Sequence, residues 1–199
     1  MLKRGFKSAA ERLSLEQRAE MDLATTDPLD PFELARFLGI PVLTFDECGR
    51  RAGLDQARRR IFSSSRGRVC ALTVCQGRRR AIIYNDRNAR TRQVSDIVHE
   101  IAHTLLEHEP APLSHPDRYA DRDPRLEEEA NYQAGTLLIP RDGALELLRL
   151  GMTETEVAEN YGVSLDMARW RCGATGAKIQ VARGQQLYQL RRRGRDARR

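Results

Sequence analysis

The sequence predicts an α+β fold in which a small antiparallel sheet packs on two central helices. Two apolar runs at 69–74 and 80–84, joined by QGRRR, predict an antiparallel hairpin. The segment 91–107 repeats apolar residues at helical spacing and predicts an amphipathic helix. The segment 125–138 predicts a second helix, which ends before Pro140 because proline lacks a backbone donor and clashes with the preceding turn.

The chain of 199 residues divides into four expected segments. Residues 1–27 hold an N-terminal helix, 28–150 form the core domain, 151–182 form a C-terminal helical pair, and 183–199 form a basic tail. The tail has few apolar residues, so we expect it to be disordered. The N-terminal helix should bury an apolar stripe that comprises Leu13, Leu15, Ala19 and Leu23.

The core should begin with a short helix and a strand. Asp30 is a favourable N-cap residue, Pro31 is a favourable first helical residue, and Gly39 marks the helix end. Residues 41–45 then predict a short strand, and a further strand is expected over 60–63, before the hairpin.

The C-terminal pair, preceded by a helix near 142–149, has helix–turn–helix spacing. Thr153 and Glu156 form a capping-box pattern that starts one helix. Gly162 turns the chain, and Ser164 starts the next helix. Two roles for the pair stay open at this point, namely structural packing on the core and contact with DNA.

The last helix of the pair offers only Arg169 and Arg171 as readers of bases or phosphates, while Trp170 is expected to anchor the core. Other arginines gather at 58–60, at 78–80 and in the tail RRRGRDARR. The net charge is +6, and 31 of the 34 basic residues are arginine. Weak nucleic-acid contact through these patches is therefore an alternative to solvated turns and a solvated tail.

His99, Glu100 and His103 spell H-E-x-x-H within the first central helix. Positions i and i+4 lie on one helix face, so both imidazoles can reach one metal ion. In the known use of this motif the glutamate is a general base and holds no metal. The alternative is a surface helix with two ordinary histidines. Both histidines, however, lie beside an apolar stripe, where an unpaired polar group is costly. That stripe comprises Val94, Ile97, Val98, Ile101, Ala102, Leu105 and Leu106.

Catalytic zinc usually has three protein ligands, and three candidates exist for the third. His108, five residues after His103, should lie at or just past the helix end and fits known ligand spacings badly. His115 lies in a proline-rich loop over 109–124, where nothing in the spacing favours it. The acidic cluster Glu127–Glu129 opens the second central helix, and a carboxylate from a second helix completes His2Glu sites.

Glu127 is the favoured member of the acidic cluster. Asn131 lies four residues later on the same helix face, where it could hydrogen-bond a ligand histidine. Ala130, Ala134 and Leu137 would pack this face against the first central helix. The other two glutamates of the cluster are expected to face water at the helix start, where the helix dipole favours negative charge.

The protein is expected in the cytoplasm, without membrane contact. No apolar run approaches the ~20 residues needed to cross a bilayer, and the N-terminus lacks an apolar segment of secretory type. The four cysteines show no C-x-x-C spacing, which fits free thiols in a reducing compartment.

The central segments resemble the ImmA/IrrE family of zinc metallopeptidase-like proteins, which share a minimal gluzincin-type core. The resemblance covers roughly residues 28–175 and rests on ARFLGIPV, AIIYND, HEIAH, EEEANYQAGTLLIP and an arginine, Arg92, seven residues before the first motif histidine. The family pattern E-x-x-A-N/D-x-F-A-x-x-L-L-x-P is matched at Glu127, Ala130, Asn131, Ala134, Leu137, Leu138 and Pro140. Gln133 replaces a usual aromatic and Gly135 a common alanine, and both changes affect helix packing.

This resemblance implies a zincin-like core and a zinc metallopeptidase, in which His99, His103 and Glu127 hold Zn2+ and Glu100 activates water. It also implies a protein substrate, typically a helix–turn–helix transcriptional repressor encoded nearby. A function of another class is the alternative: a non-proteolytic regulatory protein with a metal-stabilised core that acts by binding DNA or protein.

Overall fold

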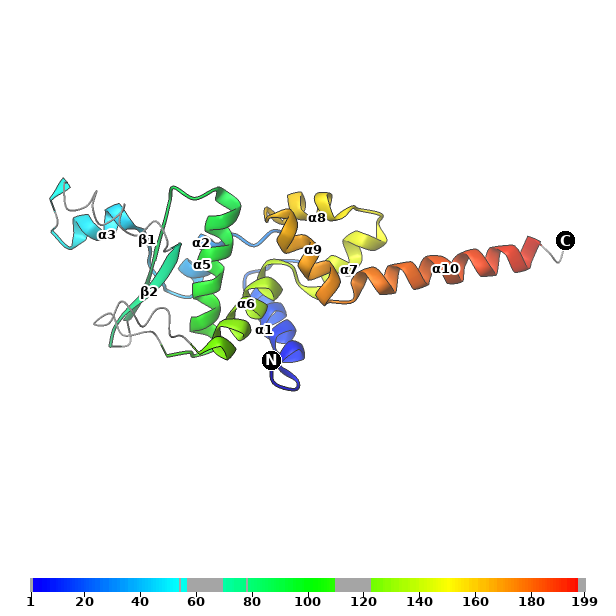
Figure 1. The fold of residues 1–199 in the computed structure, drawn as a ribbon, viewed down its shortest axis with the longest axis horizontal. Helices are drawn as coiled ribbons and strands as arrows, with labels where there is room; N and C mark the ends of the chain where they lie inside the picture. Colours follow the sequence, from blue (N-terminus) through cyan, green and yellow to red (C-terminus); the bar gives the residue numbers. More distant parts are fainter. Residues whose placement is uncertain (1, 54, 57–69, 78, 110–122, 197–199) are drawn as a thin grey trace.

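The computed structural model describes residues 2–53, 55–56, 70–77, 79–109 and 123–196, and it confirms an α+β fold (Figure 1). Three expected features lie outside the described residues: the strand over 60–63, Arg78, and most of the loop 109–124 with His115. In chain order the elements are α1 Phe6–Glu20, α2 Pro31–Phe37, β1 Val42–Thr44, α3 Phe45–Arg51, β2 Ala71–Gln76, β3 Arg79–Tyr84, α5 Arg90–Leu105, α6 Pro124–Leu138, α7 Arg141–Arg149, α8 Glu154–Tyr161, α9 Leu165–Ala174 and α10 Ala177–Asp196.

The described sheet has three strands in the order β1-β3-β2 and is mixed, so the expectation of an antiparallel sheet is wrong for one of its two pairings. The hairpin of β2 and β3 is antiparallel as expected, with Thr73 opposite Ile82. Strand β1 pairs with β3 in parallel, with Leu43 opposite Ile83. The hairpin follows from local sequence signals, whereas the β1 pairing joins segments about forty residues apart and leaves no local signature.

The sheet is packed on both faces, because successive side chains of a strand point to opposite sides. Leu72 and Ile83 cluster with Phe45 of α3 on one side. Ile82 joins the main core with α5 on the other side, where Thr73 also lies. The sheet thus lies against α5, and β2 is an edge strand of the described sheet.

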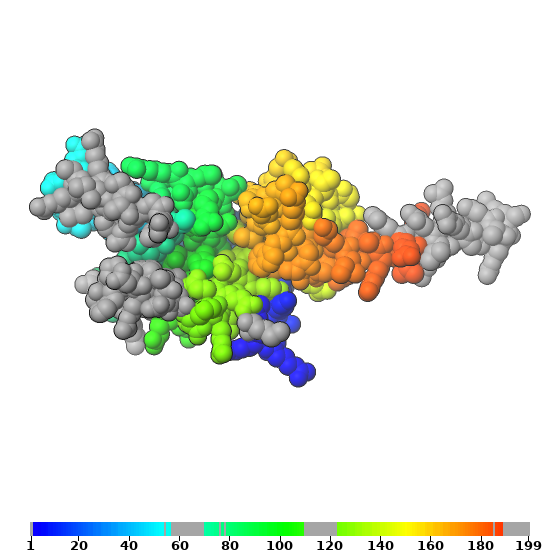
Figure 2. All heavy atoms as spheres, viewed as in Figure 1, coloured from blue at the N-terminus to red at the C-terminus, as the bar shows by residue number. Residues whose placement is uncertain are grey.

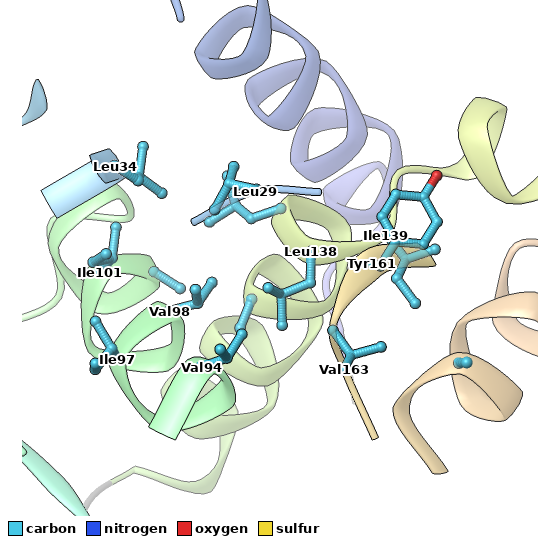
Figure 3. Close-up of a cluster of buried hydrophobic side chains, with 14 of the residues drawn as sticks. Leu29, Leu34, Val94, Ile97, Val98, Ile101, Leu138, Ile139, Tyr161 and Val163 are labelled. Carbon is cyan, nitrogen blue, oxygen red and sulfur yellow. The ribbon is translucent and has the colours of Figure 1, made fainter. Parts of the chain in front are cut away.

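Helices α5 and α6 form the centre of the core, as their apolar periodicity predicts. Figure 3 shows side chains of α5 turned toward α2 and toward Leu138 of α6. Ala130 and Ala134 of α6 are buried, which allows the two helix axes to approach closely. The α5 residues buried in this core are Val94, Ile97, Val98, Ile101 and Ala102.

Helix α1 packs on α6 mainly through a polar face, whereas Leu13, Leu15 and Leu23 of the expected apolar stripe are only half-buried. Ser14, Gln17 and Arg18 are buried, while Ala19 is exposed. The Ser14 hydroxyl donates to the Thr136 carbonyl at 2.7 Å, and the Arg18 guanidinium donates to the Leu137 and Leu138 carbonyls at 2.9 and 3.2 Å. The last carbonyls of a helix have no partner within it. The buried face of α1 is therefore polar because it supplies the donors that close the end of α6.

The C-terminal pair folds as its capping signals predict. Thr153 and Glu156 form a reciprocal capping box at the start of α8, and Gly162 ends this helix with a φ of 64°. The Ser164 hydroxyl accepts from the Met167 amide and caps α9. Helix α9 packs on α6 and α7, so the pair is built into the core. Packing is thus observed, whereas DNA contact stays a prediction.

Arg171 cannot serve as a nucleic-acid reader, because its side chain is fully buried. Its guanidinium donates to the Ile139 carbonyl at 2.9 Å and to the Glu11 carboxylate at 2.7 Å, and it thereby ties α9 to α6 and α1. Arg169 is exposed and keeps its predicted role open. The helix period places neighbouring residues about 100° apart, which separates these two arginines onto different faces.

The C-terminal segment is helical rather than disordered, since α10 continues through Ala177–Asp196 and leads away from the core (Figure 1). Alanine, glutamine and arginine have good helix propensity, which explains a helix in a segment with few apolar residues. No helix in the described part of the chain is long and apolar enough to span a membrane. The four cysteines form no disulfide with one another.

Candidate metal centre

The two motif histidines and Glu127 meet where α6 crosses α5. The Nε2 atoms of His99 and His103 are 3.0 Å apart. Each also contacts one oxygen of the Glu127 carboxylate, at 3.2 Å from His99 and 3.3 Å from His103. The three candidate ligand atoms all lie within 4.8 Å of one another. Two imidazole nitrogens and one carboxylate oxygen are the donor set of a His2Glu zinc centre, so the residues fit the metal that the sequence predicts.

The three glutamates of α6 have separate surroundings, because each is rotated by about 100° from the last. Glu127 faces the histidines, as its helical phase predicts. Glu128 is exposed and lines the neighbouring cleft. Glu129 is buried, so the expectation that it faces water is wrong, and its carboxylate lies 3.5 Å from Nε2 of His108.

His108 lies behind His103, on the side away from Glu127. It follows the end of α5, and its amide donates to the His103 carbonyl at 2.9 Å. The Nδ1 atoms of the two rings are 2.9 Å apart. Burial lowers the pKa of His108, which favours its neutral form. His108 is therefore a hydrogen-bond partner of the candidate ligand His103, and Glu129 contacts the opposite side of the His108 ring.

Asn131, expected to hold a ligand histidine, is exposed in the cleft wall. Within the described residues the structure records no hydrogen bond from its side chain to His99 or His103, and this role stays a prediction. The sequence did not single out the His108–Glu129 pair for this role. Glu129 lies two positions after Glu127, about 200° away around the helix axis, and this spacing does not indicate that both side chains contact histidines of the α5 region.

Glu100 is buried beside the candidate ligands but is not one of them. Its Oε2 accepts a hydrogen bond of 2.6 Å from the hydroxyl of Thr73. Thr73 lies on β2 and is itself buried, so the sheet orients the carboxylate of the candidate base. Sequence reasoning missed Thr73, although a threonine within an apolar strand run was the available signal.

A cleft of about 1190 Å³ opens on this centre. One side is formed by α5 and α6 with His99, Glu100 and Glu127, and the other by α9 with Met167 and Trp170. Figure 2 shows the α9 region, in orange, beside the green α5 and α6. The start of β2 also borders the cleft. A space of this size is sufficient for a short peptide segment next to the candidate metal ligands.

Arg92 and Asp96 form an ion pair on the α5 wall of the same cleft. The Nε atom of Arg92 lies 3.0 Å from the Asp96 carboxylate. Its guanidinium also donates to the Cys70 sulfur at 3.4 Å. Burial raises the pKa of Asp96. Arg92, noted in the sequence for its spacing from His99, thus neutralises a cleft carboxylate.

Comparison with known proteins agrees with this geometry. A peptidase family model described as the IrrE N-terminal-like domain matches residues 50–172, which is more than half of the chain. The matched range contains α5, α6, α8 and all but the last two residues of α9, whereas ARFLGIPV precedes it. No match was found among curated proteins. The extent of the family match, together with the H-E-x-x-H helix and the glutamate helix that it contains, shows that the chain belongs to the ImmA/IrrE family of peptidase domains.

Proposed function

We propose that the protein is a zinc-dependent endopeptidase. The observation that carries the proposal is the meeting of His99, His103 and Glu127 at one point, with the buried Glu100 beside them but outside the ligand set. Zinc held there would supply Lewis-acid activation of a water molecule and of the scissile carbonyl. The family to which the chain belongs supports peptide hydrolysis as the reaction.

In this proposal Glu100 moves the protons of the reaction. Its carboxylate takes a proton from the attacking water and delivers it to the amine that leaves. The Thr73 hydroxyl donates to Oε2 of this carboxylate at 2.6 Å, which restricts the rotation of the carboxylate. The buried position of Glu100 also removes competing bulk water from the carboxylate.

We further propose that the substrate is a regulatory protein, such as a helix–turn–helix repressor, cleaved in the cytoplasm. The resemblance to the ImmA/IrrE family supports this choice. The cleft beside the candidate ligands is open enough for an exposed loop or linker of a folded protein. Structural packing of α9 and the burial of Arg171 speak against the competing role of α9 as a base reader.

The variant Glu100→Gln tests this function, with a repressor encoded next to the gene of this protein as the substrate. Because Glu100 lies outside the ligand set, zinc content and Tm should stay close to wild type. Cleavage should fall by roughly 10²–10⁴, the usual contribution of a positioned general base. The proposal is contradicted if a strain with Glu100→Gln induces the repressed promoter normally and neither this strain nor the wild-type strain produces repressor fragments. That result would favour a binding protein.

A further inference from the structure

The positive charge of the chain is concentrated at its C-terminal end. Residues 177–199 contain eight of the 34 basic residues and one of the 28 acidic residues. They therefore carry a net charge of +7, whereas residues 1–176, with 26 basic and 27 acidic residues, carry −1. Seven of the eight basic residues are arginine, whose planar guanidinium matches the geometry of a phosphate group. The core thus contributes nothing to the net charge of +6.

Helix α10 carries this charge away from the core. Ala177 is buried and Val181 packs on the main core, so the first turns anchor the helix against α7 and α9. The described side chains from Ala182 to Tyr188 are exposed. In Figure 1 the helix then leads away from the other labelled elements. The projecting part, Ala182–Asp196, has a length of about 22 Å at 1.5 Å per residue.

The basic residues of this projecting part lie around the helix axis rather than on one face. Successive residues differ by about 100°, so Arg191, Arg192 and Arg193 occupy three different sides of α10. Asp196 is the one acidic residue of this helix. Like charges within a helical turn repel and weaken a helix. A partner with negative charge on more than one side would relieve this repulsion.

The exposed apolar residues of α10 form no continuous stripe. Ile179 and Leu187 lie about 80° apart around the axis, and Arg183 lies between them. Tyr188 lies on the side opposite Ile179. A helix that binds a membrane surface, or a second copy in a coiled coil, requires an uninterrupted apolar stripe. The pattern of α10 fits neither of these partners.

A helix with basic positions on several sides fits a groove with two negative walls. The major groove of duplex DNA is about 12 Å wide and admits an α-helix. Phosphates border this groove on both sides. An acidic surface of a folded protein presents its charge to one side of a helix and leaves the other basic positions without a partner. The arrangement of charge therefore favours duplex DNA over an acidic protein.

We propose that α10 lies in the major groove of duplex DNA and binds the phosphates on both sides of it, without dependence on base sequence. This inference goes beyond the proposed function and does not depend on it. It adds an anchor that holds the protein on DNA, where a repressor of the proposed substrate class also binds. It also assigns nucleic-acid contact mainly to α10, since Arg171 of α9 is buried.

The test is binding of a fluorescein-labelled DNA duplex to the full-length protein, measured by fluorescence anisotropy at several salt concentrations. We expect a Kd of about 10⁻⁴–10⁻⁶ M at physiological salt, the usual range of sequence-independent binding. The logarithm of the association constant should fall linearly with the logarithm of the salt concentration, by about 0.9 for each phosphate contacted. Methyl green, a ligand of the major groove, should displace the protein, whereas netropsin, a ligand of the minor groove, should not.

The triple variant Arg191→Gln/Arg192→Gln/Arg193→Gln removes three phosphate contacts and keeps residues of good helix propensity. The salt dependence should become shallower by about 2.7, and Kd should rise by about 100-fold at 0.1 M salt. A chain that ends at Leu190 removes the same arginines together with the rest of the basic tail. It should lose at least as much affinity, so the result does not depend on the folding of one variant.

The matched control is Arg4→Gln/Arg79→Gln/Arg125→Gln, which removes the same charge from three exposed positions outside α10. Its affinity for the duplex should stay within about threefold of wild type, because charges more than about 10 Å from the phosphates are screened at 0.1 M salt. An equal loss of affinity in the control and in the α10 variant would overturn the proposal.

Other results would overturn it as well. The first is a wild-type Kd above about 10⁻³ M, which is weaker than ordinary sequence-independent binding. The second is tighter binding of poly-glutamate, of phosphatidylserine–phosphatidylcholine vesicles or of an RNA duplex of the same sequence, because each assigns α10 to another partner. The third is displacement by netropsin and not by methyl green. Failure of the proposed peptidase function leaves all these measurements unchanged, since none of them requires cleavage.

Discussion

Replacing Glu129 by alanine should weaken zinc binding, although Glu129 does not reach the candidate metal position. Nε2 of His103 faces His99 and Glu127 and must be unprotonated to bind zinc. Its proton then lies on Nδ1, which donates to Nδ1 of His108 at 2.9 Å. His108 must therefore carry its own proton on Nε2, which faces the Glu129 carboxylate at 3.5 Å. The carboxylate selects the tautomer of both rings.

The magnitude follows from the burial of this chain of groups. His108 and Glu129 are 8% and 7% exposed, so water replaces neither partner easily. Loss of the partner behind a ligand histidine typically costs 10–100-fold in metal affinity, or about 1.4–2.7 kcal/mol. Glu129→Ala should fall in this range. Glu127→Ala removes a direct ligand and should lose far more.

The assay is competition for zinc against a chromophoric chelator, with Tm measured in parallel. Glu128→Ala is the matched control, since Glu128 is the adjacent glutamate of the same helix and faces the cleft. It should bind zinc like wild type. His108→Phe keeps a ring of similar size without an acceptor and should match Glu129→Ala. Wild-type affinity in both of these variants, or an equal loss in Glu128→Ala, would refute the reasoning.

Two further predictions concern positioning and packing. Thr73→Val should keep the zinc content but lower kcat by about 10–100-fold, because a hydrogen bond to a charged group contributes about 1.5–3 kcal/mol. Thr73→Ser keeps the hydroxyl and should restore most of the rate. An unchanged rate in Thr73→Val would exclude orientation of Glu100 through this bond. Arg171→Ala should lower the free energy of unfolding in urea by about 3–5 kcal/mol, because it breaks a buried ion pair with Glu11 and removes the donor to the Ile139 carbonyl. The exposed Arg169→Ala should change this free energy by less than about 0.5 kcal/mol. Equal effects would contradict the assignment of Arg171 to the core.

Local signals in the sequence were sufficient for several elements of the fold. The apolar repeat of α5 predicts its buried face, and Thr153 with Glu156 predicts the start of α8, because both depend on neighbours within one or two helical turns. Three expectations were wrong for a common reason, namely the fully antiparallel sheet, the buried apolar stripe of α1 and the role of Arg171 as a nucleic-acid reader. The observed parallel pairing of β1, the polar face of α1 and the burial of Arg171 all depend on contacts between segments far apart in sequence.

The α1 face shows this most clearly. A hydrophobic stripe assumes that a helix packs against apolar surface, but α1 packs against the carbonyl end of α6. The partners of Ser14 and Arg18 lie about 120 residues later in the chain. No periodicity within α1 itself can indicate that its buried face must supply hydrogen-bond donors.

The candidate site divides in the same way. His99, Glu100 and His103 are set by spacing on one helix, and Glu127 follows from the phase of a second helix against it. Thr73 and the His108–Glu129 pair needed the tertiary structure, because they reach the site from β2, from beyond the end of α5 and from the side of α6 away from the cleft.

Metal content tests the central claim most directly. Purified wild-type protein should hold about one zinc ion per chain by elemental analysis. The double variant His99→Ala/His103→Ala, shown to be folded by circular dichroism, should hold almost none, since two of the three candidate ligands are removed. Full retention of metal in the folded double variant, or wild-type protein that takes up no zinc, would contradict the metal centre.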